Sequence, residues 1–106
     1  MHQNNVLHRD IKPENIVIIH VLIVFIKGCV KLCDFGWAVN KKSKEDLRTT
    51  FCGTPLYLSP ELLSGAKYDE KVDIWAIGVL TYELLLEDSP FQIETQEDLH
   101  RIVKLF

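Results

Sequence analysis

Four polar side chains in the first third of the chain have the types and spacing that phosphoryl transfer requires. Asp10, Lys12 and Asn15 lie within one short polar stretch, and Asp34 opens the triplet D-F-G at positions 34–36. Phosphoryl transfer needs a carboxylate that accepts a hydroxyl proton, a cation for the transferring oxygens, and oxygen ligands for magnesium. Taken singly, each residue is more often an ordinary loop residue. Together they supply the complete set.

The stretch that holds the first three of these residues is predicted to be an extended loop. Pro13 fixes its own φ and pushes Lys12 toward an extended geometry, so residues 1–15 are expected to form no helix. Side chains alternate along an extended chain, which places Asp10 and Lys12 on the same side, where a hydroxyl and a γ-phosphate would meet. Asn15 and Asp34 then offer a carbonyl and a carboxylate oxygen, which suits a hard cation that keeps phosphate and water as further ligands.

The elements that position these residues are predicted from composition and periodicity. Residues 16–33 are rich in β-branched and aromatic side chains with a turn signal at 27–28, which predicts two strands, the clearest at Val30 to Cys33. Residues 34–60 show no periodicity and are expected to form a long functional loop. A short helical turn over Glu61 to Leu63 is expected to stop near Gly65.

Two further helices are predicted in the last third of the chain. Residues Asp73 to Leu86 carry apolar side chains on every face, which predicts a core helix with the rest of the domain packed around it. Thr95 and Asp98 have the spacing of a capping box, and an amphipathic pattern follows at Leu99, Ile102, Val103 and Phe106.

Composition limits the classes of function. The chain has 106 residues, enough for one modest domain, and its net charge of −3 with an isoelectric point near 5.7 argues against a nucleic-acid partner. The three cysteines show no C-x-x-C spacing, so neither a disulfide framework nor a zinc site is expected. Such cysteine usage is typical of proteins in a reducing compartment. The apolar run from Ile16 to Ile26 is shorter than the roughly 20 residues of a bilayer span, so no membrane partner is expected.

The string H-R-D-I-K-P-E-N at positions 8–15, followed by D-F-G at 34–36, resembles the eukaryotic protein kinase family. The resemblance implies an α+β fold, mainly an α-helical C-lobe fragment with a small β-hairpin that carries the catalytic and magnesium-binding loops. Residues 1–106 would then be a partial kinase domain without the N-lobe. Its parts would be the catalytic loop at 8–15, the magnesium loop at 34–36, the activation segment at 34–61 and the central helix at 73–86.

The same resemblance implies the roles of individual residues, with ATP and Mg²⁺ as cofactors. Asp10 would be the catalytic base and Lys12 its phosphate partner. Asn15 and Asp34 would bind the metal, and the nucleotide side of the site would hold Lys12, Glu14, Asn15 and Asp34. Thr54 would contact the catalytic Asp and Lys, which favours Ser/Thr specificity.

Two packing expectations come from the family. His8 would pack beside Phe35 without an acid–base role. Asp73, which could equally cap its helix, would hydrogen-bond the backbone of the catalytic loop. The remaining histidines, His2 and His100, are expected at the surface.

Three longer strings are similar to the Aurora kinases: D-F-G-W-A-V at 34–39, R-T-T-F-C-G-T at 48–54 and D-E-K-V-D-I-W-A-I-G-V-L at 69–80. Residues 53–57 depart from the commonest Aurora form. The similarity implies Thr50 as the activating phosphosite, with Arg9 as the side chain that receives its phosphate. It also implies protein substrates with basic residues before the Ser or Thr, regulatory activator proteins, and an intracellular location in the nucleus or at the spindle or centrosome.

Two interpretations of the chain stay open at this point. The first is an ATP-dependent Ser/Thr kinase, which the intact set of catalytic residues favours. The second is a non-catalytic kinase-like fragment that binds partners without turnover, which the lack of a glycine-rich loop and a V-A-I-K lysine favours. The apolar stretch 19–26 lies where the family usually has a polar turn, and we expect it to be an insertion or a translated intron.

Overall fold

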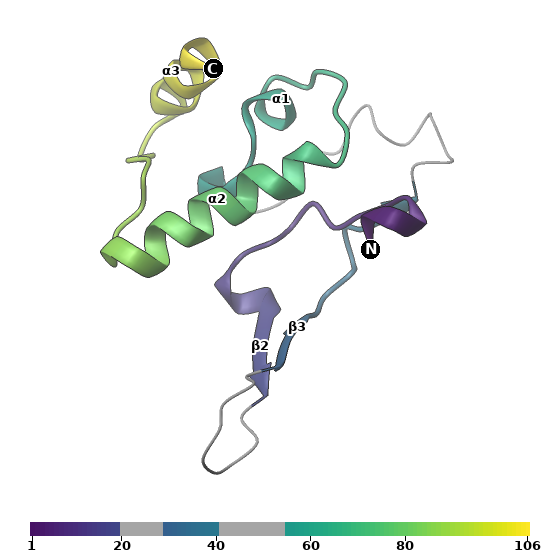
Figure 1. The fold of residues 1–106 in the computed structure, drawn as a ribbon. Coiled ribbons are helices and arrows are strands. Elements are labelled where there is room, and N and C mark those ends of the chain that lie inside the picture. The colour runs from purple at the N-terminus through teal and green to yellow at the C-terminus, as the bar shows by residue number, and fades with distance from the viewer. Residues whose placement is uncertain (20–28, 41–54) are drawn as a thin grey trace.

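The computed structural model describes residues 1–19, 29–40 and 55–106, and these residues form a small α+β fold (Figure 1). The α-helices are α1 (Pro60–Leu63), α2 (Lys71–Leu86) and α3 (Gln96–Leu105). The strands are β1 (Val6–Leu7), β2 (Ile16–Ile19), β3 (Cys29–Leu32) and β4 (Val39–Asn40). Within the described residues, single-turn 3₁₀ helices lie at His2–Asn4, Pro13–Asn15 and Pro55–Tyr57. The predicted α+β class is therefore confirmed.

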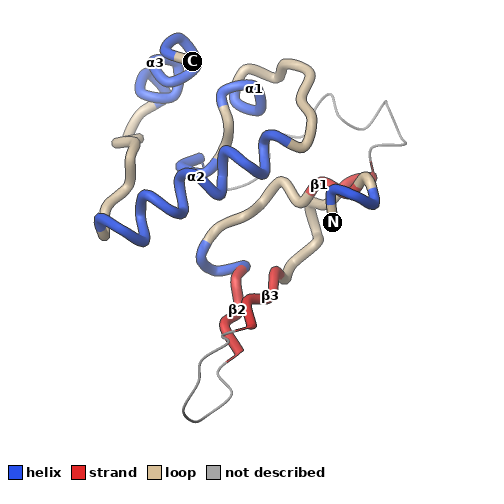
Figure 2. The backbone as a smooth tube through the Cα atoms, viewed as in Figure 1, coloured by secondary structure: helices blue, strands red, loops and turns tan. Residues whose placement is uncertain are grey.

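The strands form two separate antiparallel pairs, drawn in red where they are visible in Figure 2. β2 pairs with β3 from Ile16 opposite Leu32 to Ile19 opposite Cys29, which confirms the predicted strand pair and ends β3 one residue earlier than expected. β1 pairs with β4, Val6 opposite Asn40 and Leu7 opposite Val39. This second pair was not predicted, because two residues are too few to show alternation. The expected turn at 27–28, and most of the apolar stretch 19–26, lie outside the described residues.

The expectation that residues 1–15 form no helix is wrong in detail. The turn His2–Asn4 ends at Asn5, whose left-handed φ of 58° stops it. The turn Pro13–Asn15 begins directly after Lys12, whose backbone is extended, with Pro13 in the first position, where proline costs no hydrogen bond. Each of these helices is a single turn, so residues 1–15 still form mainly a loop.

Helix α2 begins two residues before the predicted start and ends where predicted, at Leu86. Glu87 ends it in the left-handed conformation, with its N–H donating to the Glu83 carbonyl at 2.8 Å. Its buried apolar side chains lie on one side: Val72, Ala76, Val79 and Leu80. Ile74, Leu84, Leu85 and Leu86 are more than half exposed, so the predicted covering on every face is wrong for the part of the chain that the structure describes.

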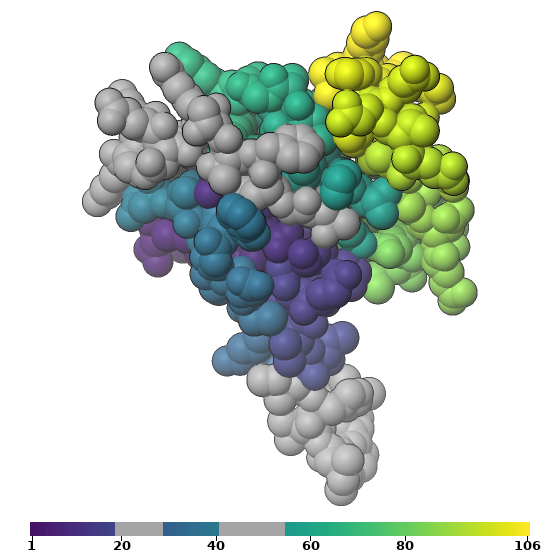
Figure 3. All heavy atoms as spheres, turned by 180° about the vertical axis from the view of Figure 1, so that it is seen from behind, coloured from purple at the N-terminus to yellow at the C-terminus, as the bar shows by residue number. Residues whose placement is uncertain are grey.

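Helices α1 and α3 contact each other on the same side of α2. The predicted capping box is confirmed, because the Thr95 hydroxyl accepts from the Asp98 N–H and the Asp98 carboxylate accepts from the Thr95 N–H. Trp75 of α2 stacks on Phe91 with ring centroids 5.7 Å apart, and Phe106 meets both rings edge-on. Viewed from behind, the atoms of residues 1–19 and 29–40 lie together on one side of the helices (Figure 3). None of the helices in the described part of the chain is long and apolar enough to cross a membrane.

Candidate active site

The carboxylate of Asp10 is the centre of a compact polar cluster. Its Oδ2 atom lies 3.1 Å from the Lys12 ammonium and accepts a hydrogen bond of 2.9 Å from the Asn15 amide nitrogen. The same amide nitrogen also donates to the Asp10 backbone carbonyl at 2.7 Å. Asp10 and Asn15 are buried and Lys12 is half-buried, so these contacts are shielded from solvent. The structure thus brings together the three residues that the sequence singled out in this loop, and Asp10 and Lys12 lie on the same side as predicted.

The local backbone explains why Asn15 reaches back to Asp10. The 3₁₀ turn is closed by the Asn15 N–H, which donates to the Lys12 carbonyl at 3.0 Å. Pro13 restricts this turn from its first position. The turn therefore shortens the distance that an extended chain would put between the two side chains.

The strand pair β2–β3 carries Asp34 to the same loop. Directly after β3, the Cys33 N–H donates to the Asn15 carbonyl at 2.9 Å, which continues the pairing past the end of the strand. Asp34 follows in a left-handed conformation with φ of 58°, and its carboxylate accepts from the Gly36 N–H at 3.1 Å. A Cβ at Gly36 would lie 3.1 Å from that carboxylate, so glycine leaves Asp34 the space it occupies.

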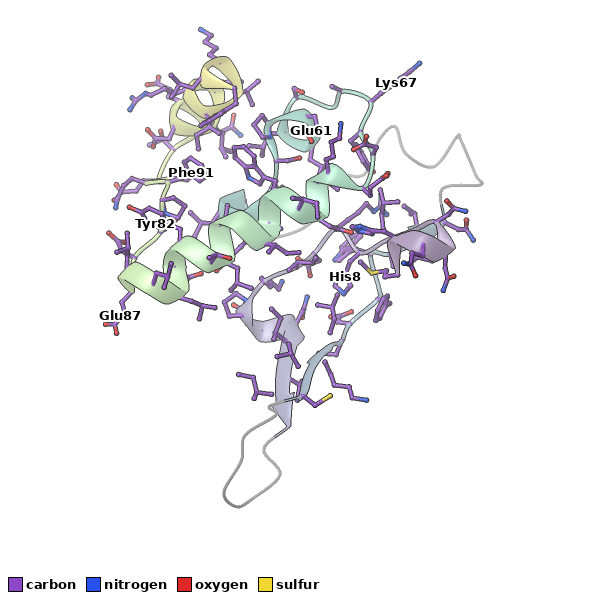
Figure 4. All side chains as sticks on the ribbon, viewed as in Figure 1. His8, Glu61, Lys67, Tyr82, Glu87 and Phe91 are labelled. Carbon is purple, nitrogen blue, oxygen red and sulfur yellow. The ribbon has the colours of Figure 1, made fainter. Side chains whose placement is uncertain are left out.

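His8 connects the two loops without being exposed. Its Nε2–H donates to the Cys33 carbonyl at 3.0 Å, and its Nδ1 accepts from the Asp10 N–H at 3.3 Å. Its ring also meets Phe35 edge-on, with centroids 4.8 Å apart, which confirms the expected packing (Figure 4 labels His8). With both ring nitrogens occupied by backbone groups, the imidazole holds the loop of residues 8–15, the predicted catalytic loop, next to the residue before Asp34.

Asp73 fixes the catalytic loop to helix α2. Its carboxylate is 1% exposed and accepts from the His8 N–H at 2.9 Å and the Arg9 N–H at 2.8 Å. The family-based expectation for Asp73 is confirmed, whereas the helix cap, which was expected to be compatible with it, is wrong, because the helix begins at Lys71.

Sequence reasoning missed His2. It was expected at the surface, but it is partly buried and its Nε2 lies 2.6 Å from the Asp73 carboxylate. The contact depends on the first 3₁₀ turn and on β1, whose pairing with β4 directs the chain toward α2. A lone histidine in a polar stretch gives no signal for such a contact. The hydrogen bond from His2 makes it a third donor to the buried carboxylate.

The donor atoms of Asn15 and Asp34 are of the kind that suits a magnesium ion. Because the Asn15 amide nitrogen is engaged by Asp10, the carbonyl Oδ1 is the atom this side chain offers to a metal. The Asp34 carboxylate is exposed and follows the residue that pairs with Asn15. No group of three or more His, Cys, Asp or Glu side chains among the described residues could hold a metal alone. Two protein oxygens with phosphate and water completing the shell is the arrangement that Mg²⁺ favours.

A second group of acidic side chains lies near the catalytic loop. The Tyr57 hydroxyl donates to the Glu83 carboxylate of α2. Burial, this hydrogen bond and the negative charges of Glu83 and Glu14 together raise the pKa of Tyr57 well above its ordinary value. Glu14 is exposed, between Lys12 and Asn15 in the chain. Glu14 and Glu83 therefore both act with negative charge on Tyr57, and we call these two carboxylates the negative region.

The residues that were expected to be regulatory are only partly described. Arg9 is buried, with a left-handed φ of 66°. Left-handed φ at both Arg9 and Asp34, neither of them glycine, is the kind of strain that concentrates at functional sites, at about 1–3 kcal/mol each. Thr50 and Thr54, expected as phosphosite and substrate-loop residue, lie outside the described residues, as does the whole segment 41–54.

Comparison with known proteins agrees with this geometry. The protein kinase domain family matches residues 1–106. The chain belongs to the protein kinase family. It is 54% identical over 97 residues to an Aurora kinase of Eremothecium gossypii, which covers 92% of this chain and 24% of that protein. It is 50% identical over 92 residues to an Aurora kinase of Schizosaccharomyces pombe (87% of this chain, 24% of that protein) and 46% identical over 100 residues to Aurora kinase A-B of Xenopus laevis (94% and 22%).

This kinase chain spans about a quarter of the length of the curated relatives that it matches. The resemblance drawn from H-R-D-I-K-P-E-N and D-F-G is confirmed at the level of the family, and the similarity to Aurora kinases extends over most of the chain. The roles of Asp10, Lys12, Asn15 and Asp34 stay predictions that the geometry supports.

Proposed function

We propose that this chain is part of an Aurora-type protein kinase that transfers the γ-phosphoryl group of ATP to serine or threonine hydroxyls of proteins. The observation that carries the proposal is the cluster in which Lys12 and Asn15 both contact the Asp10 carboxylate. The pairing of Cys33 with Asn15 places the residue before Asp34 next to this cluster. A structural loop has no need for an ammonium, an amide and a carboxylate held in this way.

Each side chain has a task in this proposal. Asp10 accepts the proton of the substrate hydroxyl while the hydroxyl oxygen forms a bond to the γ-phosphorus of ATP and ADP leaves. Lys12 shares the Asp10 carboxylate and places positive charge near the transferred phosphoryl oxygens. Asn15 and Asp34 would hold Mg²⁺, with Glu14 beside the nucleotide, and the bound metal neutralises charge on the phosphates. His8 and Asp73 keep the two loops in register.

The negative region at Glu14 and Glu83 supports a preference for basic substrates. Both carboxylates act on Tyr57, which lies in the 3₁₀ turn after the segment 41–54. A lysine or arginine before the target Ser or Thr would be attracted to such a region next to the catalytic loop. We therefore propose protein substrates with basic residues before the phosphorylated hydroxyl.

We also propose that phosphorylation of Thr50 activates the enzyme, with Arg9 receiving the phosphate. A phosphothreonine adds a charge of about −1.5 to −2 and three acceptor oxygens. Arg48 stands two residues before Thr50, which matches the proposed preference and suggests phosphorylation of one copy by another. Activator proteins and a nuclear, spindle or centrosomal location belong to the same proposal, through the similarity to Aurora kinases.

The test is phosphate transfer by a chimaera in which this chain replaces the matched segment of the Eremothecium gossypii kinase. Transfer from radiolabelled MgATP to a peptide with Arg before Ser should be lowered about 100-fold or more by Asp10→Asn, because the general base is lost. Asp69→Asn, a matched change at a carboxylate outside the cluster, should leave the rate unchanged. An equal rate for Asp10→Asn and the parent would contradict the proposal.

A non-catalytic binding fragment is the second candidate, and it applies to the 106 residues alone. It is favoured because the chain spans about a quarter of the length of its relatives and because the leucines at the end of α2 are exposed. The chain alone should then bind a partner without transferring phosphate. Transfer by the chain alone, lost on Asp10→Asn, would exclude this candidate.

A further inference from the structure

In the described part of the chain, the last turn of α2 is an apolar surface in contact with solvent. Leu84, Leu85 and Leu86 are 71%, 75% and 59% exposed, whereas Leu80, one turn earlier, is buried. An apolar patch of this kind, when polar groups border it, is typical of a surface that binds another molecule. The chemistry of the bordering groups then indicates which kind of molecule fits.

Two carboxylates border the exposed leucines. Glu87 ends α2 and Asp88 follows it, three and four positions after Leu84, and both residues are exposed. Residues at this spacing lie about one helical turn apart on the same side. The Glu87 side chain points away from the body of the molecule (Figure 4). None of the ion pairs among the described residues involves either carboxylate.

The negative charge at this end of α2 does not stabilise the free chain. The helix dipole places partial negative charge at a C-terminus, where basic side chains would be favourable and acidic ones are not. The last turn of α2 contains no basic residue, and no Lys or Arg occurs between Lys71 and Arg101. Exposed leucines and uncompensated carboxylates therefore coincide at one place. A partner that is both apolar and cationic would satisfy both.

The other molecules that cover apolar surfaces fit this one less well. An anionic membrane surface would repel Glu87 and Asp88. In a two-fold dimer the same surface of each copy meets its counterpart, so the carboxylates of the two copies would face each other. A basic segment of another protein has neither disadvantage, because its charge is complementary.

We propose that Leu84, Leu85, Glu87 and Asp88, which we call the α2-end surface, bind a basic amphipathic helix of a partner protein. A helix offers no free strand edge, so the partner must bind through its side chains. An amphipathic helix presents apolar side chains along one face with cationic ones beside them, which matches the leucines and the carboxylates. This inference goes beyond the proposed phosphoryl transfer and uses none of its catalytic residues.

The test is the binding of a fluorescein-labelled peptide of about 18 residues, long enough to form a helix, with leucines on one helix face and lysines on the other. The full 106-residue chain is titrated into the peptide, and fluorescence anisotropy reports binding. The same peptide with glutamates in place of the lysines is the control. The lysine peptide should bind at least about 10-fold more tightly, and added NaCl should reduce the difference because it screens exposed charges.

Charge variants of the chain locate the binding site. Glu87→Gln combined with Asp88→Asn should weaken binding of the lysine peptide about 10-fold, because two exposed charge pairs are lost. Glu94→Gln combined with Glu97→Gln removes the same amount of charge at exposed carboxylates outside the α2-end surface. This control should bind the peptide as the parent does.

A leucine variant tests the apolar part of the surface. Leu84→Ser combined with Leu85→Ser should weaken binding about 10-fold or more, because the peptide then buries less apolar area. Both side chains are largely in solvent, so thermal unfolding should change little. Association of the chain with itself through these leucines should give way when the lysine peptide is added, as sedimentation velocity would show.

Several results would overturn the proposal. They include equal binding of the two peptides, full binding by the charge variant or the leucine variant, and a loss on Glu14→Gln instead, which would place the peptide at the negative region. A dimer that the peptide does not dissociate would assign the surface to a second copy. Tighter binding to vesicles of phosphatidylserine and phosphatidylcholine would assign it to a membrane. None of these results bears on phosphate transfer, which the chimaera tests separately.

Discussion

The two halves of helix α2 meet the rest of the molecule in opposite ways. Its first turn carries Asp73, which is 1% exposed and accepts hydrogen bonds from His2, His8 and Arg9. Its last turn carries Leu84 and Leu85, which are 71% and 75% exposed. One helix thus has a polar anchor at its start and exposed leucines at its end.

The difference is that the described residues supply the polar contacts of the first turn of α2 but no apolar packing for its last turn. The catalytic loop is held by directional bonds between short segments of this chain, so its geometry is set locally. Apolar packing at the end of α2 needs a surface to cover it, and exposed leucines in a cluster favour association. The polar end should therefore respond strongly to mutation, and the apolar end weakly.

The largest expected effect is at the polar anchor. Asp73→Ala leaves the N–H groups of His8 and Arg9 without their acceptor in a buried place, at about 1–3 kcal/mol for each unsatisfied group. We expect the free energy of unfolding to fall by several kcal/mol in chemical denaturation. Amide hydrogen exchange at His8 and Arg9 should accelerate as well.

Asp69→Ala is the matched control for this prediction. Asp69 lies four residues earlier, and its exposed carboxylate accepts from the Lys71 N–H at 2.9 Å and lies 3.9 Å from the Lys71 ammonium. Because both contacts are exposed to solvent, their loss should cost only about 1 kcal/mol. Equal losses for Asp69→Ala and Asp73→Ala would show that the anchor is not the main tie between the loop and the helix.

The next effect contrasts two leucines on the same helix. Leu80→Ala removes a buried side chain that is 9% exposed and should cost about 2–5 kcal/mol of unfolding free energy. Leu85→Ala should change stability by no more than about 0.5 kcal/mol, because that side chain is largely in solvent. It should also reduce self-association in sedimentation velocity. A loss at Leu85 as large as that at Leu80 would mean that the end of α2 is covered.

A smaller effect is expected at the catalytic end without any loss of fold. Gly36→Ala brings a Cβ to 3.1 Å from the Asp34 carboxylate, which must then shift by a few tenths of an ångström. Because Asp34 is proposed as a metal ligand, the apparent affinity for Mg²⁺ in the chimaera should fall about 10-fold. Thermal unfolding should be unchanged. An unaltered Mg²⁺ dependence would argue against Asp34 as a ligand.

The sequence predicted the elements whose signals are local. The β2–β3 pair, the end of α2 at Leu86 and the Thr95–Asp98 capping box all depend on residues close together in the chain, and all are confirmed. The grouping of Asp10 with Lys12 was predicted for the same reason, since alternation in an extended loop places them together. The H-R-D and D-F-G motifs predicted the family.

What the sequence did not predict depends on contacts between distant segments. The pair β1–β4 joins residues more than thirty positions apart, and His2 reaches Asp73 across 71 positions. The bond from Arg9 to Tyr68 spans 59 positions and has no local signal. The exposure of α2 was mispredicted because a helix that is apolar all round indicates burial without indicating what covers it.

The smallest expected effect concerns the hydrogen bond from Tyr57 to Glu83, which is the polar contact described between the second half of α2 and another element. Burial and the nearby carboxylates of Glu83 and Glu14 raise the pKa of Tyr57 in the fold. In the unfolded chain the hydroxyl loses its proton near its ordinary pKa of about 10, whereas in the fold it keeps it. The unfolded state then binds fewer protons, so this contribution to stability is complete below about pH 10 and declines as the pH rises above it.

The measurement is the difference in unfolding free energy between the parent and Tyr57→Phe, followed from about pH 8 to about pH 11, across the ordinary tyrosine pKa. The difference should be constant up to about pH 10 and then shrink, because only the parent has the shifted group. Tyr82→Phe, at an exposed tyrosine on the same helix, should give a difference that does not change over this range. If the Tyr57 difference also stays constant, the hydroxyl is not held by Glu83, and the far half of α2 has no polar anchor of its own in the described part of the chain.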